Sequence, residues 1–397
     1  MSEYFKIEFF QFMSNKKNIA IYVILLFFSC YYALKISPEY DPIEKVDVSE
    51  IEARYLTRDE FLKHVVINEW TNYYVRFAAG IYPEWNKYDK KRLDAIKQGN
   101  LDDYAEATFK WYTYSDNIIV NWGSDILYYN PGYYTYGNNY ARADGHYAYL
   151  YSASRFEGYT EGKSNLSINV FEERTALQTL QRLLNAYLPL ILLVSCILFT
   201  VDIVMKDRRN PTLLQGLPLS DWGKLIVKGG VSLLGSILAI IPLSVGLLII
   251  GARNGFGDFK LPVPIYNSSE KIFSNIMMWQ YLIENMIFMM FWFLFIITLL
   301  LIVSVTLKNE FANLVVGCVF VVAEFMYYVR GIGHYRDVQW YPTSYVQVGQ
   351  IISGHRNFLY VTDGLTVGTG LFIIGLCTCI FLFVTFLISH HRKFKLF

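Results

Sequence analysis

Cysteine is scarce in this sequence, and the longest polar segment has none. Five cysteines occur in 397 residues, and residues 36–182 contain no cysteine at all. A disulfide framework therefore cannot stabilise that segment. The six histidines are scattered along the chain, and no spacing of Cys and His matches a metal site. We expect neither disulfides nor a metal centre.

A nucleotide-binding loop is also missing. Six residues separate Gly216 from the Gly223-Lys224 pair, whereas a phosphate-binding loop requires four. Leu225 follows the lysine at the position that needs Ser or Thr. No arrangement of a nucleophile and a base stands out among the hydroxyl residues. We therefore expect no ATPase site and no catalytic residues in this chain.

Charge is nearly absent from six long apolar runs. Apolar residues make up 54% of the chain, with a mean hydropathy of +0.27, and they collect into runs of bilayer-spanning length. The runs are Asn18–Leu34, Tyr187–Val204, Leu225–Ile250, Met278–Leu307, Ala312–Val329 and Thr366–Ser389. The sequence thus predicts an all-α polytopic membrane protein with six transmembrane helices. Pro242 should kink the third helix or open a hydrogen bond in it.

The charged residues between these runs predict which ends face the cytoplasm. Basic residues gather in alternate linkers, which the positive-inside rule explains if both termini are cytoplasmic. They are Lys6, Lys16, Lys17, Lys206, Arg208, Arg209, Lys224, Lys228, Lys308, Arg392, Lys393 and Lys395. The segment from Ser37 to Arg182 has 16 basic and 22 acidic residues, a net charge of −6. It should lie outside the cell.

Four regions follow from this pattern. We predict an amphipathic interface helix in residues 1–17, the first transmembrane helix in 18–35, an extracellular domain in 36–182, and transmembrane helices two to six in 183–397. A cytoplasmic loop at 205–224 should join the second of these helices to the third. In the interface helix, Phe5, Phe9 and Phe12 share one face with Met13. Alternatively, this segment is an irregular start of the first transmembrane helix.

The extracellular domain should be mainly helical. Apolar spacing predicts helices near Ser49–Phe77 and Lys90–Tyr114, and another over Leu166–Leu184 that runs directly into the second transmembrane helix. Ten tyrosines and several glycines between Tyr128 and Tyr159 favour loops and short strands. These rings offer a binding surface for a cationic peptide. The alternative, which we slightly favour, is that they form the domain core or rest on the membrane interface.

The loop 205–224 contains an apolar cluster within a charged connection. Its members are Leu213, Leu214, Leu217, Leu219 and Trp222. Such side chains either dock into a groove of a partner or rest on lipid headgroups, and the residues alone favour neither. Ser220 is suited to cap the helix that follows.

The same loop resembles a known family. The run Asp207-Arg208-Arg209, Thr212-Leu213-Leu214, Leu217-Pro218-Leu219-Ser220 and Gly223-Lys224 is similar to the second cytoplasmic loop of ABC-2 type export permeases. Asp207 replaces the usual Glu, and Asn210-Pro211 replaces a small-Gly pair. Residues Lys6–Phe10 with Lys16-Lys17 resemble that family's interface helix. The segment Trp340–Tyr345 with Gly349 and Gly354 resembles its connection between helices five and six, which partly re-enters the bilayer.

The resemblance implies a subunit of an ATP-driven exporter in a bacterial plasma membrane. Two copies of a separate ATPase subunit, which use ATP and Mg, would drive a dimer of permeases, and this chain would bind no cofactor and no nucleic acid. The coupling helix would span Arg209–Asp221, and Phe5, Phe9 and Phe12 would make a second contact. Its coupling residues would be Arg209, Leu213, Leu214, Leu217, Pro218, Ser220, Asp221 and Trp222.

The cargo remains open from sequence, with a peptide or an amphipathic, lipid-like molecule favoured. A different possibility is a membrane-anchored sensor or scaffold whose extracellular domain binds a ligand without transport. A membrane enzyme ranks third because a catalytic constellation is missing.

Three acidic residues lie within the apolar runs. Glu284 and Glu324 should sit near the outer surface, where they either line an exit path for a cationic or amphipathic substrate or bond to neighbouring residues. The neighbours expected for that structural role are Tyr327, Tyr328 and Arg330. Asp202 should pair with Lys206, one helical turn later.

Overall fold

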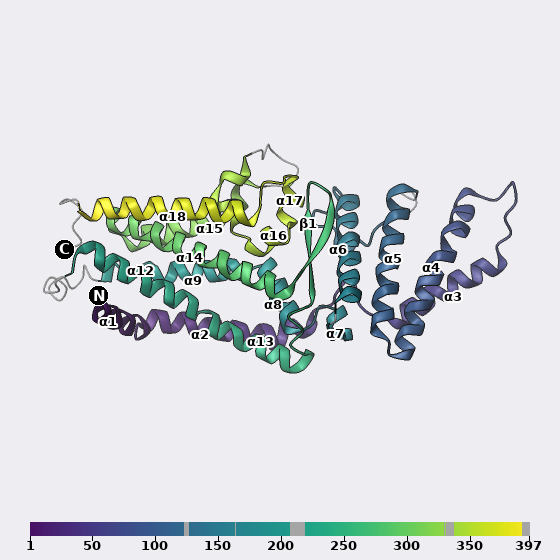
Figure 1. Ribbon diagram of the computed structural model, residues 1–397, viewed down its shortest axis with the longest axis horizontal. Coiled ribbons are helices and arrows are strands. Elements are labelled where there is room, and N and C mark those ends of the chain that lie inside the picture. The colour runs from purple at the N-terminus through teal and green to yellow at the C-terminus, as the bar shows by residue number, and fades with distance from the viewer. Residues whose placement is uncertain (123–126, 163, 207–218, 329, 331–336, 391–397) are drawn as a thin grey trace. The chain divides into compact units, whose positions relative to one another are not determined.

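The computed structural model describes residues 1–122, 127–162, 164–206, 219–328, 330 and 337–390. Most of these residues are helical, and two short strands form a hairpin. The chain divides into two compact units (Figure 1). Unit 1 comprises Met1–Glu39, Thr179–Arg253 and Leu282–Phe397, whereas unit 2 comprises Tyr40–Gln178 and Asn254–Tyr281.

Unit 1 contains the helices of a membrane protein. Within the described residues, four helical segments are long and apolar enough to cross a bilayer: Lys16–Glu39, Asp221–Asn254, Met278–Leu307 and Val367–His390. The pair Ile168–Asn185 and Leu188–Thr200, bent by 68°, makes a fifth if its arms cross as one span. The multi-pass helical class therefore agrees with the prediction, while the count of six stays a prediction.

The first and third apolar runs form interrupted helices. Helix α1 (Ser2–Met13) precedes α2 (Lys16–Tyr31), which continues into a π-helical turn η1 (Tyr32–Ile36) and a 3-10 turn η2 (Ser37–Glu39). The third run is split between α12 (Asp221–Leu238) and α13 (Ile240–Asn254). Pro242 explains the split, because its ring conflicts with the carbonyl of Leu238, the last residue of α12. The predicted disruption is thus confirmed.

The expected continuous helix from Leu166 into the second apolar run is wrong. The chain instead forms α7 (Ile168–Phe171), α8 (Ala176–Asn185) and α9 (Leu188–Thr200). Glu173 adopts a left-handed conformation, with φ of 54°, which ends α7. Apolar spacing alone gave no sign of this break.

The C-terminal half of unit 1 alternates long and short helices. The 30-residue helix α14 (Met278–Leu307) turns at Lys308 into α15 (Glu310–Tyr327). Asn309 caps the first turn of α15, because its side chain accepts a hydrogen bond from Phe311 N at 2.8 Å. Short helices then lead to the last helix, α18 (Val367–His390). They are η4 (Val338–Trp340), η5 (Pro342–Tyr345), α16 (Val348–Ile352) and α17 (His355–Tyr360).

Tight packing holds these short helices against α14 and α18. Tyr345 is fully buried, and its carbonyl accepts from Trp292 Nε1 at 2.9 Å. A Cβ at Gly370 of α18 would lie 2.6 Å from the Tyr345 ring, so glycine allows the close approach. Whether this segment re-enters a bilayer stays a prediction.

Four helices of unit 2 pack in chain order, each against the next (Figure 1). They are α3 (Val48–His64), α4 (Tyr73–Gln98), α5 (Leu101–Asn121) and α6 (Ala141–Glu161). The predicted helix over Ser49–Phe77 is wrong, because a loop separates α3 from α4. The next predicted helix, Lys90–Tyr114, is divided where Gly99 takes a left-handed φ of 70° after α4.

Helix α6 contradicts the prediction of loops and strands between Tyr128 and Tyr159. Only the first part of that stretch is irregular, with the 3-10 turn η3 (Pro131–Tyr133). Gly145 lies within α6, where its lack of a side chain allows close packing: a Cβ at this position would lie 2.1 Å from the Tyr129 ring. The high tyrosine content was a poor guide to secondary structure, because tertiary packing decides the conformation of aromatic-rich segments.

The strands lie in a segment where none was predicted. β1 (Pro262–Asn267) pairs antiparallel with β2 (Ile272–Met277), and Pro262 faces Met277 in the register. This hairpin packs on α6, where Tyr147 contacts Tyr266 and Phe273 with ring centroids about 5 Å apart. Unit 2 therefore consists of a segment close to the predicted 36–182 domain together with the connection between α13 and α14.

Candidate functional site

The N-terminal helix α1 packs along α12 and α9 within unit 1. Its buried residues Tyr4, Glu8 and Phe12 recur at four-residue spacing and form one stripe. The Phe12 ring lies against Gly235, where a Cβ would come within 2.2 Å of it. It also contacts the Phe199 ring at a centroid distance of 5.4 Å. This helix is therefore an integral part of the bundle.

The predicted interface face of α1 is turned toward the protein. Phe12 is buried, and Phe5 and Phe9 are half-buried and stacked on each other. The exposed apolar residues of the helix are Ile7, Phe10 and, from the predicted face, Met13; Phe10 is 73% exposed. A membrane or partner that meets this helix from outside meets these side chains first.

A buried ion pair fastens α1 to α12. Lys228 donates from Nζ to Glu8 Oε1 at 2.8 Å, and both residues are less than a tenth exposed. Removing two charges from water costs several kcal/mol each, so the pair persists only as a matched set. The start of α12 lies nearby as well, since a Cβ at Gly223 would be 3.1 Å from Met1 Cε. The first turns of α1 and α12 therefore run side by side.

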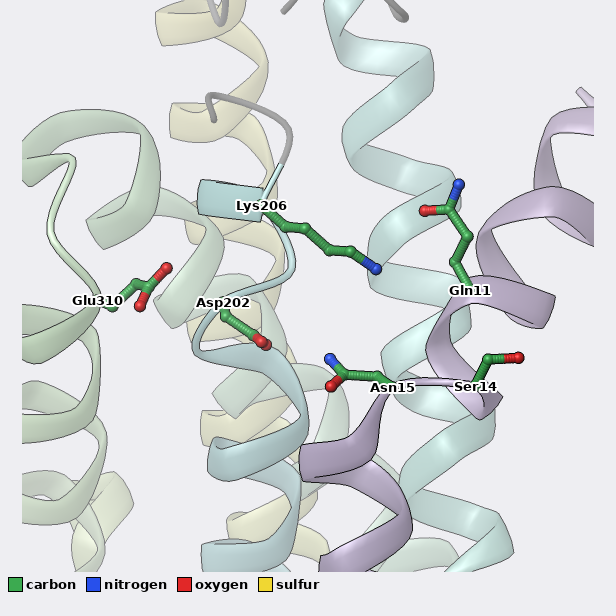
Figure 2. A pocket seen from close by; sticks show the side chains of 6 residues that line it. All are labelled: Gln11, Ser14, Asn15, Asp202, Lys206 and Glu310. Carbon is green, nitrogen blue, oxygen red and sulfur yellow. The ribbon is translucent and has the colours of Figure 1, made fainter. Parts of the chain in front are cut away.

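A polar hollow adjoins this helix pair. Its volume is about 420 Å³, and its lining comes from the α1–α2 junction, the chain after α9 and the first turn of α15. The lining residues are Gln11, Ser14, Asn15, Asp202, Lys206 and Glu310. Lys206 extends across the hollow toward α1, and the Asp202 carboxylate points toward Asn15 (Figure 2).

The partner of Asp202 differs from the prediction. Its carboxylate binds the Lys17 ammonium of α2, which also donates to the Leu198 carbonyl at 2.5 Å. Lys206 contacts Asp202 through a backbone hydrogen bond alone: the Lys206 backbone N–H donates to the Asp202 carbonyl at 2.9 Å. The expected Asp202–Lys206 pair is therefore wrong, because a lysine from a neighbouring helix reaches the carboxylate.

Most of the predicted coupling loop lies outside the described residues. Arg209, Leu213, Leu214, Leu217 and Pro218 belong to that part of the chain.

The end of the loop is described, and it begins α12. Ser220 caps this helix as predicted, accepting from Gly223 N at 3.1 Å. Asp221 pairs with Lys224 at 3.7 Å. Trp222 is half-buried, and its ring meets Phe386 of α18 edge-on at 5.4 Å. The Trp222 side chain thus already has a contact within its own unit.

Glu324 lies at the centre of a buried cluster in unit 1. It is 1% exposed, and its Oε1 accepts from Tyr360 Oη at 2.9 Å and from Arg356 at 2.9 Å. The Tyr328 ring lies against that of Tyr360 at a centroid distance of 4.0 Å, with the two planes tilted by 37°. These contacts are those of the structural alternative, and both partners come from α17. The Tyr327 side chain lies outside the part of the chain that the structure describes.

Glu284 is half-buried in α14 and has an interaction partner. The predicted role of Glu284 and Glu324 in a substrate path stays a prediction.

Unit 2 is built around a second set of buried charges. Arg155 of α6 binds Glu44 and, at 2.7 Å, Glu173. Burial raises the pKa of Glu44 despite the opposing effect of Arg155, and the Glu173 charge adds to the rise. Burial alone would lower the pKa of Arg155, but the two carboxylates raise it well above its usual value. One guanidinium thus holds two acidic groups in the core.

Aromatic rings surround this charged group. Tyr129, Tyr149 and Tyr159 are buried, and the Tyr149 ring meets those of Tyr129 and Tyr112 edge-on at 4.8 and 5.2 Å. Burial, followed by the Glu44 charge, raises the pKa of Tyr149 to about 12. These three tyrosines of the stretch belong to the domain core, whereas Tyr128 is 78% exposed.

Sequence reasoning missed the groups that tie the helices together. Glu8, Lys17, Lys228 and Arg356 were either counted as surface charge or not considered. A signal was available, since an ionisable residue inside an apolar helix face needs a partner. Glu8 stands between Tyr4 and Phe12 on such a face. The identity of each partner could not be read, because it lies on a distant part of the chain.

No protein-family model matches the chain, and none of the characterised proteins or solved structures compared with it is similar. Among the described residues, no three His, Cys, Asp or Glu side chains are grouped to hold a metal ion.

Proposed function

We propose that this chain is the permease subunit of an ATP-driven exporter. It contributes the transmembrane path, while a separate ATPase subunit binds ATP and Mg. The observation that carries the proposal is the Glu8–Lys228 pair, which joins the N-terminal helix to the helix that follows the loop 205–224. A force applied to α1 or to the start of α12 would then move both.

The path of the chain supports the membrane topology that this function needs. Unit 2 is compact, which supports placing both of its segments on the same side of a bilayer. Between Gln178 and Asn254 the chain would then cross an even number of times. The segment Asp221–Asn254 would be one of these crossings, and the bent pair ending in α9 would be the other. If α14, α15 and α18 each cross, six spans place both termini opposite unit 2.

In this arrangement the ends and the loop 205–224 are cytoplasmic, and unit 2 is extracellular. Two ATPase copies would engage a pair of permeases, formed by two copies of this chain or by this chain and a paralogue. The basic linkers support the orientation through the positive-inside rule. The cargo we propose is a peptide or an amphipathic, lipid-like molecule, moved outward across a bacterial plasma membrane.

Changing Leu217 to Asp should abolish copurification of the partner ATPase. Leu217 is the apolar residue before Pro218 in the sequence, and a carboxylate there would have to be desolvated in an apolar groove. The measurement is pull-down of the tagged permease, followed by quantification of the ATPase. A normal amount of ATPase on the Leu217→Asp permease would contradict the assignment.

The matched control is Phe256→Asp. Phe256 belongs to unit 2 and is 54% exposed, so the same new charge falls on the side proposed to be extracellular. This variant should retain the ATPase. Loss of the partner in both variants would indicate a folding defect.

The two acidic residues of the apolar helices provide a test of the substrate path. In a Glu284→Gln, Glu324→Gln variant, we expect export of a cationic cargo to fall, because Glu284 no longer attracts it and Arg356 loses the Glu324 carboxylate that it binds. Export is measured with a cargo identified by its stimulation of ATP turnover. Unchanged export at equal expression would remove both residues from the path.

A further inference from the structure

The loop between α3 and α4 exposes an unusual group of apolar side chains. We call residues Val65–Tyr74 the α3–α4 tip; Figure 1 shows this loop joining the two helices. Trp70 is 93% exposed, more than any other large apolar residue in the described chain. Exposed apolar side chains that cluster in this way mark interaction sites more often than scattered ones do. The others in the tip are Val66, Ile67, Tyr73 and Tyr74.

The backbone beneath these side chains is firmly held. The Asn68 side chain accepts from Trp70 N at 3.0 Å and from Thr71 Oγ1 at 3.1 Å, and Asn68 N donates to Thr71 Oγ1 at 2.7 Å. Arg76 donates to the carbonyls of Asn68 and Glu69, at 2.9 and 2.5 Å. Trp70 is therefore displayed on a preorganised turn, which lowers the entropy lost when a partner binds.

The net charge of unit 2 indicates which kind of partner the apolar tip can bind. Unit 2 contains 17 basic and 23 acidic residues, a net charge of −6. Within the tip the only charged residue is Glu69, and the nearby Arg76 is engaged by backbone carbonyls. An anionic bilayer surface and a second copy of unit 2 would both be repelled. A cationic partner with an apolar face is attracted.

We propose that the α3–α4 tip is a docking surface for a cationic amphipathic peptide. Trp70 and Val66 bury the apolar face of the peptide, and the tyrosines at the start of α4 provide flanking contact area with polar hydroxyl ends. The negative field of unit 2 draws in the lysines or arginines of the peptide. Docking involves only unit 2 and needs neither ATP nor an ATPase, so it stands independently of the proposed export function.

The test measures peptide binding to the full chain in phosphatidylcholine nanodiscs. The probe is a fluorescein-labelled amphipathic helical peptide of lysine and leucine, with the signal from empty nanodiscs subtracted. A Val66→Ser, Trp70→Ser variant should bind at least about tenfold more weakly, since central Trp anchors dominate such interfaces. Both residues are exposed, so the variant should melt at the same temperature as the parent protein. Binding to the parent should weaken as salt rises.

Two controls make the result specific. A Tyr136→Ser variant changes an exposed ring of the tyrosine-rich stretch, outside the tip, and should bind normally. A peptide with glutamate in place of lysine should not bind. Equal binding by the parent and the tip variant overturns the proposal. It is also overturned if Trp70 proves necessary for liposome attachment or for self-association, while peptide binding is absent.

Discussion

Replacing Arg155 with Met should lower the melting temperature of unit 2 by roughly 10 °C. The change leaves Glu44 and Glu173 in the core without the guanidinium that both now bind. Removing one partner of a buried ion pair costs about 3–5 kcal/mol. In a domain of this size each kcal/mol lowers the melting temperature by about 2–4 °C. The measurement is thermal unfolding of the full chain in detergent, followed by tryptophan emission and by protease cleavage within unit 2.

A matched control distinguishes the loss of a buried, paired arginine from the loss of an exposed one. Arg142 lies on the same helix but is exposed, with one hydrogen bond to the Val120 carbonyl at 3.0 Å. Arg142→Met should therefore change the melting temperature little. Adding Glu44→Gln and Glu173→Gln to the Arg155 variant should restore part of the loss, because neutral amides need no counter-charge. If Arg155→Met melts like the parent, the buried pair does not stabilise unit 2.

Replacing Glu8 with Leu should release α1 from the bundle. Lys228 is 2% exposed, and without the Glu8 carboxylate its ammonium loses the acidic partner that it now binds at 2.8 Å. We expect a loss of about 3–5 kcal/mol from the packing of this helix. The released helix should become sensitive to protease, and ATPase copurification should fall if α1 is the second contact.

The double variant Glu8→Leu, Lys228→Leu is the informative comparison. It removes both charges and restores an apolar contact, so protease resistance should return. Lys6→Leu serves as the surface control, because Lys6 and Glu3 form an exposed pair whose loss should have no measurable effect. Equal protease sensitivity in the single and double variants would contradict a role for charge pairing.

Features governed by local chemistry were predictable from the sequence. The length and apolarity of α14 followed from an uninterrupted run, and Pro242 marked the break between α12 and α13 because proline acts on the turn before it. Ser220 was identified as a helix cap since its side chain bonds within its own turn. Each prediction depended on atoms a few residues apart.

Features set by distant contacts were not predictable. The tyrosine-rich stretch formed α6 because its rings pack on partners from α5, such as Tyr112. Glu324 found Arg356 and Tyr360, 32 and 36 residues later in the numbering. A single sequence without covariation gives no information on such pairs.

The two-part construction of unit 2 has a mechanical consequence. The chain passes between the units at four points: after Glu39, Gln178, Arg253 and Tyr281. Unit 2 is thus covalently tethered to the ends of α2, α8, α13 and α14 at once. Any rearrangement that changes the separation of these helix ends must strain unit 2 or move it as a block. For the same reason, a fragment limited to residues 36–182 would lack the hairpin and leave one side of α6 uncovered.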